Sequence, residues 1–171
     1  MGEYECELAQ KEGKIETGIL RLHNVYGPPC EMSPEKSQVI PALCRKAIKY
    51  PEEKFVVWGS GNQRRAFLYV DDAVDAIITA WDKGMGKGVI QIGPSESHSI
   101  AEIAEKIVNI SGKEIQITYD NSKPEGDKDR FADWSKAKKI LRWYPKVLIH
   151  DGLRHTYEWS KKTLNGIPKS V

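Results

Sequence analysis

Three polar segments of this 171-residue sequence have residue types that suit an anionic ligand. RLHNVYGPP (residues 21–29) carries Asn24, whose amide can both donate and accept and so suits a phosphate oxygen or a sugar hydroxyl. WGSGNQRRAF (58–67) carries two glycines that let backbone approach a ligand, and Arg65, whose guanidinium matches two phosphate oxygens. KPEGDKDR (123–130) ends on a second such cation, Arg130. Each segment alone also fits ordinary structure, since Asn24 suits a turn and the other two suit solvated loops.

The elements that must position these segments alternate between strand and helix patterns. We expect strands near residues 15–22, 55–58, 66–70, 89–92 and 115–119, and helices near 1–10, 38–49, 71–81, 99–110, from 135, and 151–164. Ser99 and Glu102 form a capping-box pattern, and Asp71 and Asp72 are expected to cap the helix that follows them. This alternation predicts an α/β fold with Asn24 at the carboxyl end of a strand, the edge where open α/β sheets bind ligands.

Composition excludes several other classes of protein. Lys and Arg number 26 against 24 Asp and Glu, a net charge of +2 with no basic stripe, so we expect no nucleic-acid partner. The chain has no apolar run of about 18 residues and no signal-peptide pattern, so we expect no membrane association. Three cysteines without a C-x-x-C pair favour a reducing, cytoplasmic location, and the four histidines lack metal-ligand spacing, so we expect no metal site.

Four ordered blocks together resemble a known family. RLHNVYGPP, VIPALCRKA, WGSGNQRRAFLYVDDAV and KPEGDKDRFADWSKAKKILRWYP are similar to the C-terminal half of the extended short-chain dehydrogenase/reductases, the NAD-dependent nucleotide-sugar epimerases and dehydratases. The resemblance covers residues 1–171. It implies the C-terminal part of a Rossmann-type doubly wound sheet, to which 1–34 and about 66–94 contribute, plus a small α/β substrate-binding subdomain from about 35–65 and 95–165.

The resemblance also implies roles for individual residues. Those assigned to a UDP- or GDP-sugar are Asn24, Arg65 and Arg130 around the diphosphate and neighbouring sugar, and Val39, Leu43 and Trp58 in the base pocket. His23 would lie near the nicotinamide of a complete enzyme, although a structural role fits it equally well. The complete enzyme would use NAD or NADP and form a homodimer through the helix that ends in residues 1–12.

The family's own catalytic signatures are missing from this sequence. Its Gly-rich dinucleotide turn and its Tyr-x-x-x-Lys helix are both absent, and the resemblance places that lysine just before Met1. Three Tyr-x-x-x-Lys spacings, starting at Tyr50, Tyr119 and Tyr157, are interpreted as chance matches, and the glycines at 84, 86 and 88 precede a strand. We therefore expect no catalytic residue, no bound dinucleotide and no activity in this chain alone.

Gln38 separates the sequence from its most similar subfamilies. GDP-fucose synthases and GDP-mannose 3,5-epimerases place a protonating His or Lys just before the run that VIPALCRKA resembles, and glutamine cannot replace it as an acid. A 4-epimerase, such as a UDP-glucose 4-epimerase, or a 4,6-dehydratase does not need that group. The function expected is therefore that of the sugar-nucleotide-binding half of an epimerase (an isomerase) or dehydratase (a lyase). The alternative is a non-catalytic module that binds a nucleotide sugar or docks on a partner. The base, the sugar and the reacting carbon stay open.

Overall fold

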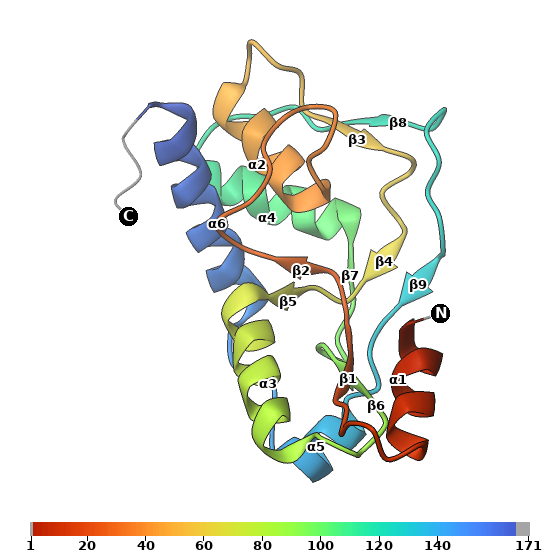
Figure 1. Cartoon of the computed structure of the whole chain (residues 1–171). Coiled ribbons are helices and arrows are strands. Elements are labelled where there is room, and N and C mark those ends of the chain that lie inside the picture. Colours follow the sequence, from red (N-terminus) through yellow and green to blue (C-terminus); the bar gives the residue numbers. More distant parts are fainter. Residues whose placement is uncertain (1, 167–171) are drawn as a thin grey trace. The chain divides into compact units, whose positions relative to one another are not determined.

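The computed structural model describes residues 2–166, which form two compact units. The first comprises the residues up to Val25 together with Ala66–Glu96 and Phe131–Lys146. The second comprises Tyr26–Arg65, Ser97–Arg130 and the residues from Val147 onward. Figure 1 gives the order of elements along the chain. The chain crosses from the first unit to the second within β2 (Val25–Tyr26).

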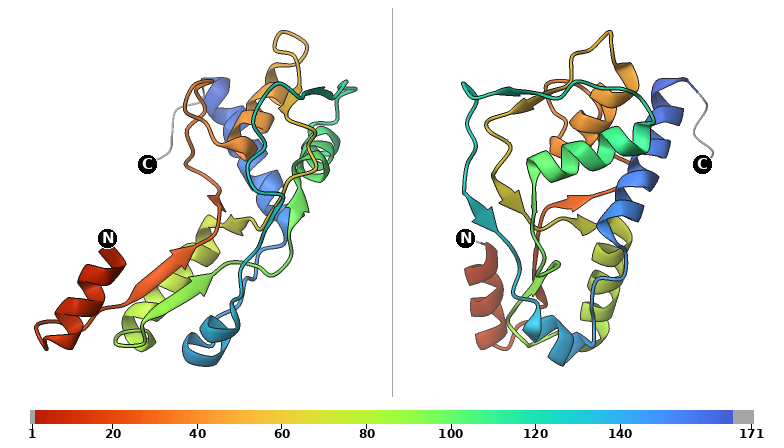
Figure 2. Two further views of the ribbon diagram at one scale, coloured as in Figure 1. Left: turned by 90° about the vertical axis from the view of Figure 1, so that its right-hand side faces the viewer. Right: turned by 180° about the vertical axis from the view of Figure 1, so that it is seen from behind.

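The first unit contains a parallel pair of strands and three helices. Its elements are α1 (Gly2–Lys11), β1 (Ile19–Leu22), β5 (Leu68–Tyr69), α3 (Val70–Lys83), β6 (Val89–Ile92) and α5 (Ser135–Leu141). β1 and β6 run side by side in the same direction, with Ile19 opposite Val89 and Leu22 opposite Ile92 (Figure 2). A parallel pair connected through a helix is the basic unit of α/β folds, so the predicted α/β class is confirmed.

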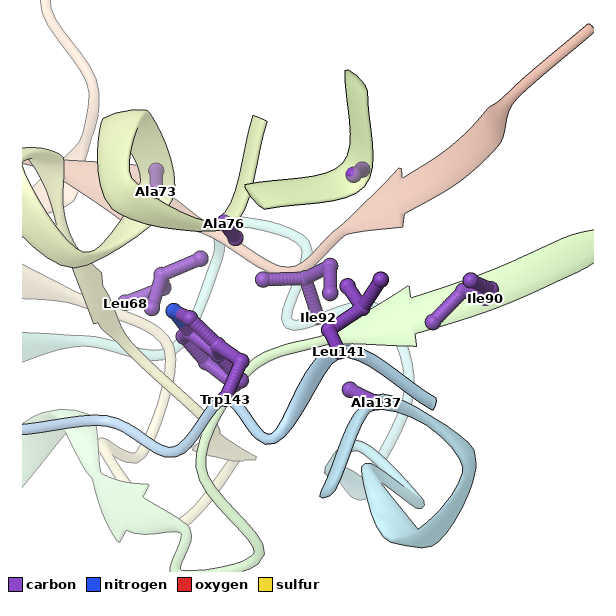
Figure 3. Close-up of a cluster of buried hydrophobic side chains, with 9 residues drawn as sticks. Leu68, Ala73, Ala76, Ile90, Ile92, Ala137, Leu141 and Trp143 are labelled. Atoms are coloured by element: carbon purple, nitrogen blue, oxygen red, sulfur yellow. The ribbon is translucent and has the colours of Figure 1, made fainter. Parts of the chain in front are cut away.

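One apolar cluster holds α3, β6 and α5 together. Its buried side chains include Leu68, Ala76, Ile92, Leu141 and Trp143 (Figure 3). The Trp143 indole N–H donates to the Asp72 carbonyl at 3.1 Å, so the ring is buried with its polar atom paired.

This packing places residues 131–146 in the first unit, whereas the sequence placed them in the substrate-binding subdomain. The reason is that Ala137, Leu141 and Trp143 complete the cluster around β6. The first unit resumes at Ala66. The assignment of the two units to a Rossmann sheet and to substrate binding stays a prediction.

The second unit is built on three mutually packed helices with short strands beside them. Its elements are α2 (Val39–Lys49), β3 (Val56–Trp58), β4 (Arg64–Arg65), β7 (His98–Ser99), α4 (Ile100–Ser111), β8 (Thr118–Asp120), β9 (Asp129–Arg130) and α6 (Ile149–Leu164). The Ser99 hydroxyl accepts from the Glu102 amide at 3.0 Å and the Glu102 carboxylate accepts from the Ser99 amide at 3.2 Å, which confirms the predicted capping box. Pro41 lies in the first turn of α2, where a missing N–H breaks no helical bond.

Two details of the prediction were wrong. The strand expected over 15–22 begins only at Ile19, because the Gln10 side chain accepts from both the amide and the hydroxyl of Thr17 and holds that segment in another path. Asp71 and Asp72 lie inside the first turn of α3 without a side-chain cap, and Asp72 instead accepts from the Lys146 amide at 3.0 Å. Within residues 2–166, no helix is long and apolar enough to cross a membrane.

Candidate functional site

Two segments far apart in sequence pair in parallel at two places in the second unit, in two separate sheets. β3 pairs with β8, so that Trp58 is opposite Asp120, and β4 pairs with β9, so that Arg65 is opposite Arg130. The Gly59 amide donates to the Asp120 carbonyl at 2.8 Å, which continues the β3–β8 pairing by one residue. Adjacent strands lie about 4.8 Å apart, so the register makes Arg65 and Arg130 neighbours on the same face. Two of the three predicted anionic-ligand segments are therefore brought together.

Arg65 is half-buried, and its partners are neutral. Nη1 donates to the carbonyls of Arg64 at 2.7 Å and Asp127 at 2.6 Å, and Nη2 donates to that of Glu125 at 3.4 Å. Within residues 2–166, Nε has no acceptor, and no carboxylate forms an ion pair with this guanidinium. The side chain is thus oriented by the backbone while its charge stays available to an anion.

Arg130 is the more open of the two cations. Its side chain is 66% exposed, and its ion pair with Asp127 is long, at 4.0 Å. Exposed pairs of this kind contribute roughly 0–1 kcal/mol, so a multiply charged ligand can replace the aspartate at little cost.

Trp58 adds an aromatic surface on the β3–β8 pair. The residue is 57% exposed although it ends a strand, and the Lys123 ammonium lies 5.5 Å from the ring centroid in a cation–π contact. An exposed indole on a fixed backbone offers a flat face on which a heterocyclic base can stack.

The two residues predicted on α2 differ in how much surface they offer. Leu43 is only 2% exposed and packs in the interior of the second unit, which leaves little of it for a ligand. Val39 is half-buried in the first turn of the helix. Their roles in a base pocket stay predictions.

Asn24 and His23 belong to the first unit, at the carboxyl edge of the β1–β6 pair. The Asn24 side-chain amide donates to the Ala66 carbonyl at 2.9 Å, and the Asn24 backbone carbonyl accepts from the Leu68 amide at 3.2 Å. His23 donates its backbone N–H to Ile92 at 3.0 Å and packs so closely on Gly93 that a methyl group there would lie 2.9 Å from the His23 Cβ. Both residues thus have visible structural roles, and Asn24 keeps an exposed side chain at the expected edge.

Two of the three Tyr-x-x-x-Lys spacings lie outside a helix, and the third, on α6, has a buried tyrosine. Tyr50 ends α2 and precedes Pro51, and Tyr119 lies on β8. Tyr157 is buried on α6, and burial raises its pKa, the opposite of what a neighbouring lysine does to an acid/base tyrosine.

The glycines at 84, 86 and 88 do not fit a dinucleotide. They follow α3 and precede β6, and the Gly84 amide donates to the Ala80 carbonyl at 2.8 Å, ending the helix. A pyrophosphate site needs a strand that leads into a helix N-terminus, so these residues do not form one. Within residues 2–166, no group of three or more His, Cys, Asp or Glu side chains is arranged to hold a metal ion.

Sequence reasoning did not single out Lys123 or Glu125. Lys123 lies over Trp58, and the Glu125 carboxylate accepts from the Ser60 amide, a contact between residues 65 positions apart. No local pattern indicates such a pairing, because a charged loop is ordinarily solvated.

Comparison with known proteins gives these features a family context. Residues 1–93 match the model of the NAD dependent epimerase/dehydratase family. GDP-L-fucose synthase 1 of Arabidopsis thaliana is 39% identical over 144 residues, which is 82% of this chain and 44% of that protein.

Two solved structures show the same fold. UDP-glucose 4-epimerase of Thermotoga maritima, solved with UDP-glucose, superposes with a TM-score of 0.87 at 30% identity, covering 95% of this chain and 51% of that one. UDP-glucuronic acid 4-epimerase of Bacillus cereus, in complex with UDP-glucuronic acid and NAD, has a TM-score of 0.77 at 31% identity, with coverages of 95% and 50%. The chain spans about half the length of the relatives it matches.

Proposed function

Because this chain belongs to the NAD dependent epimerase/dehydratase family, we propose that its second unit binds the diphosphate and base of a nucleotide sugar. The observation that carries the proposal is the register that makes Arg65 and Arg130 neighbours, with Trp58 on the adjoining strand of the same segment. The relatives described above include a GDP-sugar enzyme and two proteins solved with UDP-sugars, so both nucleotide classes are candidates.

The charge balance supports a diphosphate. A nucleotide sugar carries two negative charges on its bridging phosphates. The β4–β9 pair presents the guanidinium groups of Arg65 and Arg130, and within the described residues 2–166 neither group has a close carboxylate partner. Each charge-assisted hydrogen bond of this type contributes about 1.5–3 kcal/mol. Stacking of the base on Trp58 adds apolar contact. A sugar-nucleotide role for Asn24, which belongs to the first unit, rests on the family resemblance and on its amide chemistry alone.

The chemical step is proposed for the complete enzyme and not for this chain alone. The family's NAD or NADP supplies hydride transfer, but the glycines at 84, 86 and 88 do not precede a helix N-terminus, and the one Tyr-x-x-x-Lys spacing on a helix has a buried tyrosine. The contribution of this chain is to bind and orient the sugar nucleotide. Gln38, exposed at the start of α2, offers no acid, which favours a 4-epimerase or 4,6-dehydratase over reactions that need a proton there.

We further propose a homodimer and a reducing, cytoplasmic location. In support, α1 has no buried residue and exposes Tyr4 and Leu8, and Cys6, Cys30 and Cys44 are free thiols. Sedimentation analysis that finds only monomer at micromolar concentration would contradict association through α1.

Calorimetric titration with UDP, GDP and their sugars tests the binding proposal. We expect saturable binding that weakens about 10- to 100-fold in Arg65→Ala and in Arg130→Ala, as the loss of one charge-assisted contact requires. Arg154→Ala is the matched control, because Arg154 is an exposed arginine of the same unit that pairs with Asp151 on α6. Equal affinity in all three variants would refute the site. Epimerisation or oxidation of a nucleotide sugar by this chain with added NAD would refute its proposed inactivity.

A further inference from the structure

The loop between β8 and β9 has almost no buried surface to fix it. Each residue from 121 to 130 is exposed, so hydrophobic packing does not determine the path of this loop. Yet the loop carries Lys123 over Trp58 and leads directly into Arg130. Its position therefore depends on a few polar contacts.

One of these contacts joins the loop to the turn that follows β3. A carboxylate oxygen of Glu125 accepts from the Ser60 backbone N–H at 2.5 Å. This bond lowers the pKa of the Glu125 carboxyl, so the group is charged at neutral pH and the bond is charge-assisted. Ser60 lies outside any helix or strand, and its amide is paired through the Glu125 carboxylate.

The turn is shaped to receive this side chain. Gly59 has φ +75°, and a methyl group on it would collide with the Glu125 Cγ and lie 2.9 Å from its Oε1. Glycine at this position thus meets two requirements at once: it adopts a left-handed backbone, and it leaves room for the glutamate.

The other side of the same loop is held by Arg65. Its guanidinium donates to the carbonyls of Glu125 and Asp127, and Gly126, at φ +70°, lies so close that a methyl group there would be 3.2 Å from Nη2. Glu125 is therefore connected by its side chain to the turn beside Trp58 and by its backbone to Arg65.

We propose that Glu125 is a positioning residue for nucleotide binding: by anchoring the 121–130 loop to the Gly59–Gly61 turn, it holds Trp58 with Lys123 and Arg65 with Arg130 in one preformed surface. This inference rests on the proposed function of the second unit. It predicts that Glu125 raises nucleotide affinity although its negative charge opposes the ligand.

Titration of the complete 171-residue chain with UDP and GDP tests this prediction. Glu125→Ala is expected to bind about tenfold more weakly, the effect of one lost hydrogen bond, while Glu125→Gln, whose amide oxygen can still accept from Ser60, stays within about threefold of the unaltered chain. Glu114→Ala, which removes an exposed carboxylate of the same unit, is the matched control and is expected to leave affinity unchanged. If Glu125→Gln keeps the affinity that Glu125→Ala loses, the hydrogen bond to Ser60 is the cause and the charge of Glu125 is not.

A second readout does not need the ligand. In amide NMR spectra, the Ser60 signal is expected far downfield in the unaltered chain, shifted upfield in Glu125→Ala, and intermediate in Glu125→Gln. A Ser60 signal that Glu125→Ala leaves in place would overturn the anchor.

The outcomes separate this inference from the function on which it rests. If the unaltered chain binds a nucleotide and Glu125→Ala binds equally or more tightly, the inference fails and the proposed function stands. If Glu125→Gln is as weak as Glu125→Ala, the hydrogen bond is not the cause and the inference also fails. If the unaltered chain binds none of the nucleotides, the proposed function fails, and the positioning role fails with it.

Discussion

Arg45 is expected to be the polar residue on which the second unit depends most for stability. It lies on α2 with only 4% of its surface exposed. Its Nε donates to both carboxylate oxygens of Glu53, at 3.2 and 3.1 Å, and its Nη2 donates to one of them at 2.9 Å. Its Nη1 donates to the Met32 carbonyl at 3.0 Å and to the Ser37 hydroxyl at 3.1 Å. One guanidinium therefore ties the helix to the loop before it and the turn after it.

The exposure of Glu53 determines how far Arg45→Ala is expected to lower the free energy of unfolding. Breaking a fully buried ion pair by removing one partner costs about 3–5 kcal/mol. The Glu53 side chain is 29% exposed, so water can solvate part of the orphaned carboxylate, and we expect the free energy of unfolding to fall by about 2–3 kcal/mol. Urea denaturation followed by circular dichroism measures this difference. Arg154→Ala, which removes an exposed pair, is expected to change it by less than about 1 kcal/mol.

The Arg45–Glu53 pair also predicts how the free energy of unfolding depends on pH. Arg45 lowers the pKa of the Glu53 carboxyl below its ordinary value of 4.5. A carboxyl with a lowered pKa in the folded state contributes stability above its unfolded pKa, and this contribution is lost as the pH falls through the folded pKa. The stability difference between the unaltered chain and Arg45→Ala should therefore narrow below about pH 4. A loss of stability in Arg45→Ala that equals that of Arg154→Ala, or that does not change with pH, would show that the Arg45–Glu53 pair does not stabilise the second unit.

Three further predictions follow from single contacts. Ser99→Ala removes the capping box of α4 and should lower the free energy of unfolding by about 1 kcal/mol in urea denaturation, whereas Ser99→Asp, which can still cap, should lose less. Leu141→Ala opens a cavity in the cluster around β6 and should cost about 2–5 kcal/mol by the same measurement; a cost below 1 kcal/mol would show that the cluster does not hold the first unit together. Burial raises the pKa of the Cys44 thiol, so in a native-state thiol assay Cys44 should react last and Cys6, which is partly exposed, should react sooner; early labelling of Cys44 would contradict its burial.

Local signals in the sequence were sufficient for the helices and for one of the strands. The capping box at Ser99 and Glu102 is contained within four residues, and β6 is a short run closed by Gly93 and Pro94, so both were predicted at the observed positions. Where a distant side chain intervenes, local reasoning fails. Thr17 has the composition of a strand, but the Gln10 side chain satisfies its amide and hydroxyl and delays β1 to Ile19.

The site was predicted in its residues but not in its connections. The resemblance identified Arg65, Arg130 and Trp58, and the structure pairs Arg65 with Arg130 across β4 and β9 and places Trp58 on the separate β3–β8 pair. The two-residue strands β4 and β9 are too short for any periodicity to indicate. Glu125 was missed because its partner, the Ser60 amide, is a backbone group that the sequence does not mark.

The burial of Leu43 was also beyond the sequence. An apolar residue on an amphipathic helix can face either the core or a ligand, and only the packing of α2 with α4 and α6 shows that this one faces the interior.

Amide NMR spectra of the isotopically labelled chain, recorded during titration with UDP-glucose and then with a GDP-sugar, report directly on whether the second unit binds a nucleotide sugar. We expect saturable shift changes in the indole N–H of Trp58, the amides of the Gly59–Gly61 turn, the Arg65 side chain and the 121–130 loop, with at least one of the two nucleotides. If no chemical shift changes with either nucleotide, or if shifts change only at other residues, the second unit does not bind a nucleotide sugar on this surface.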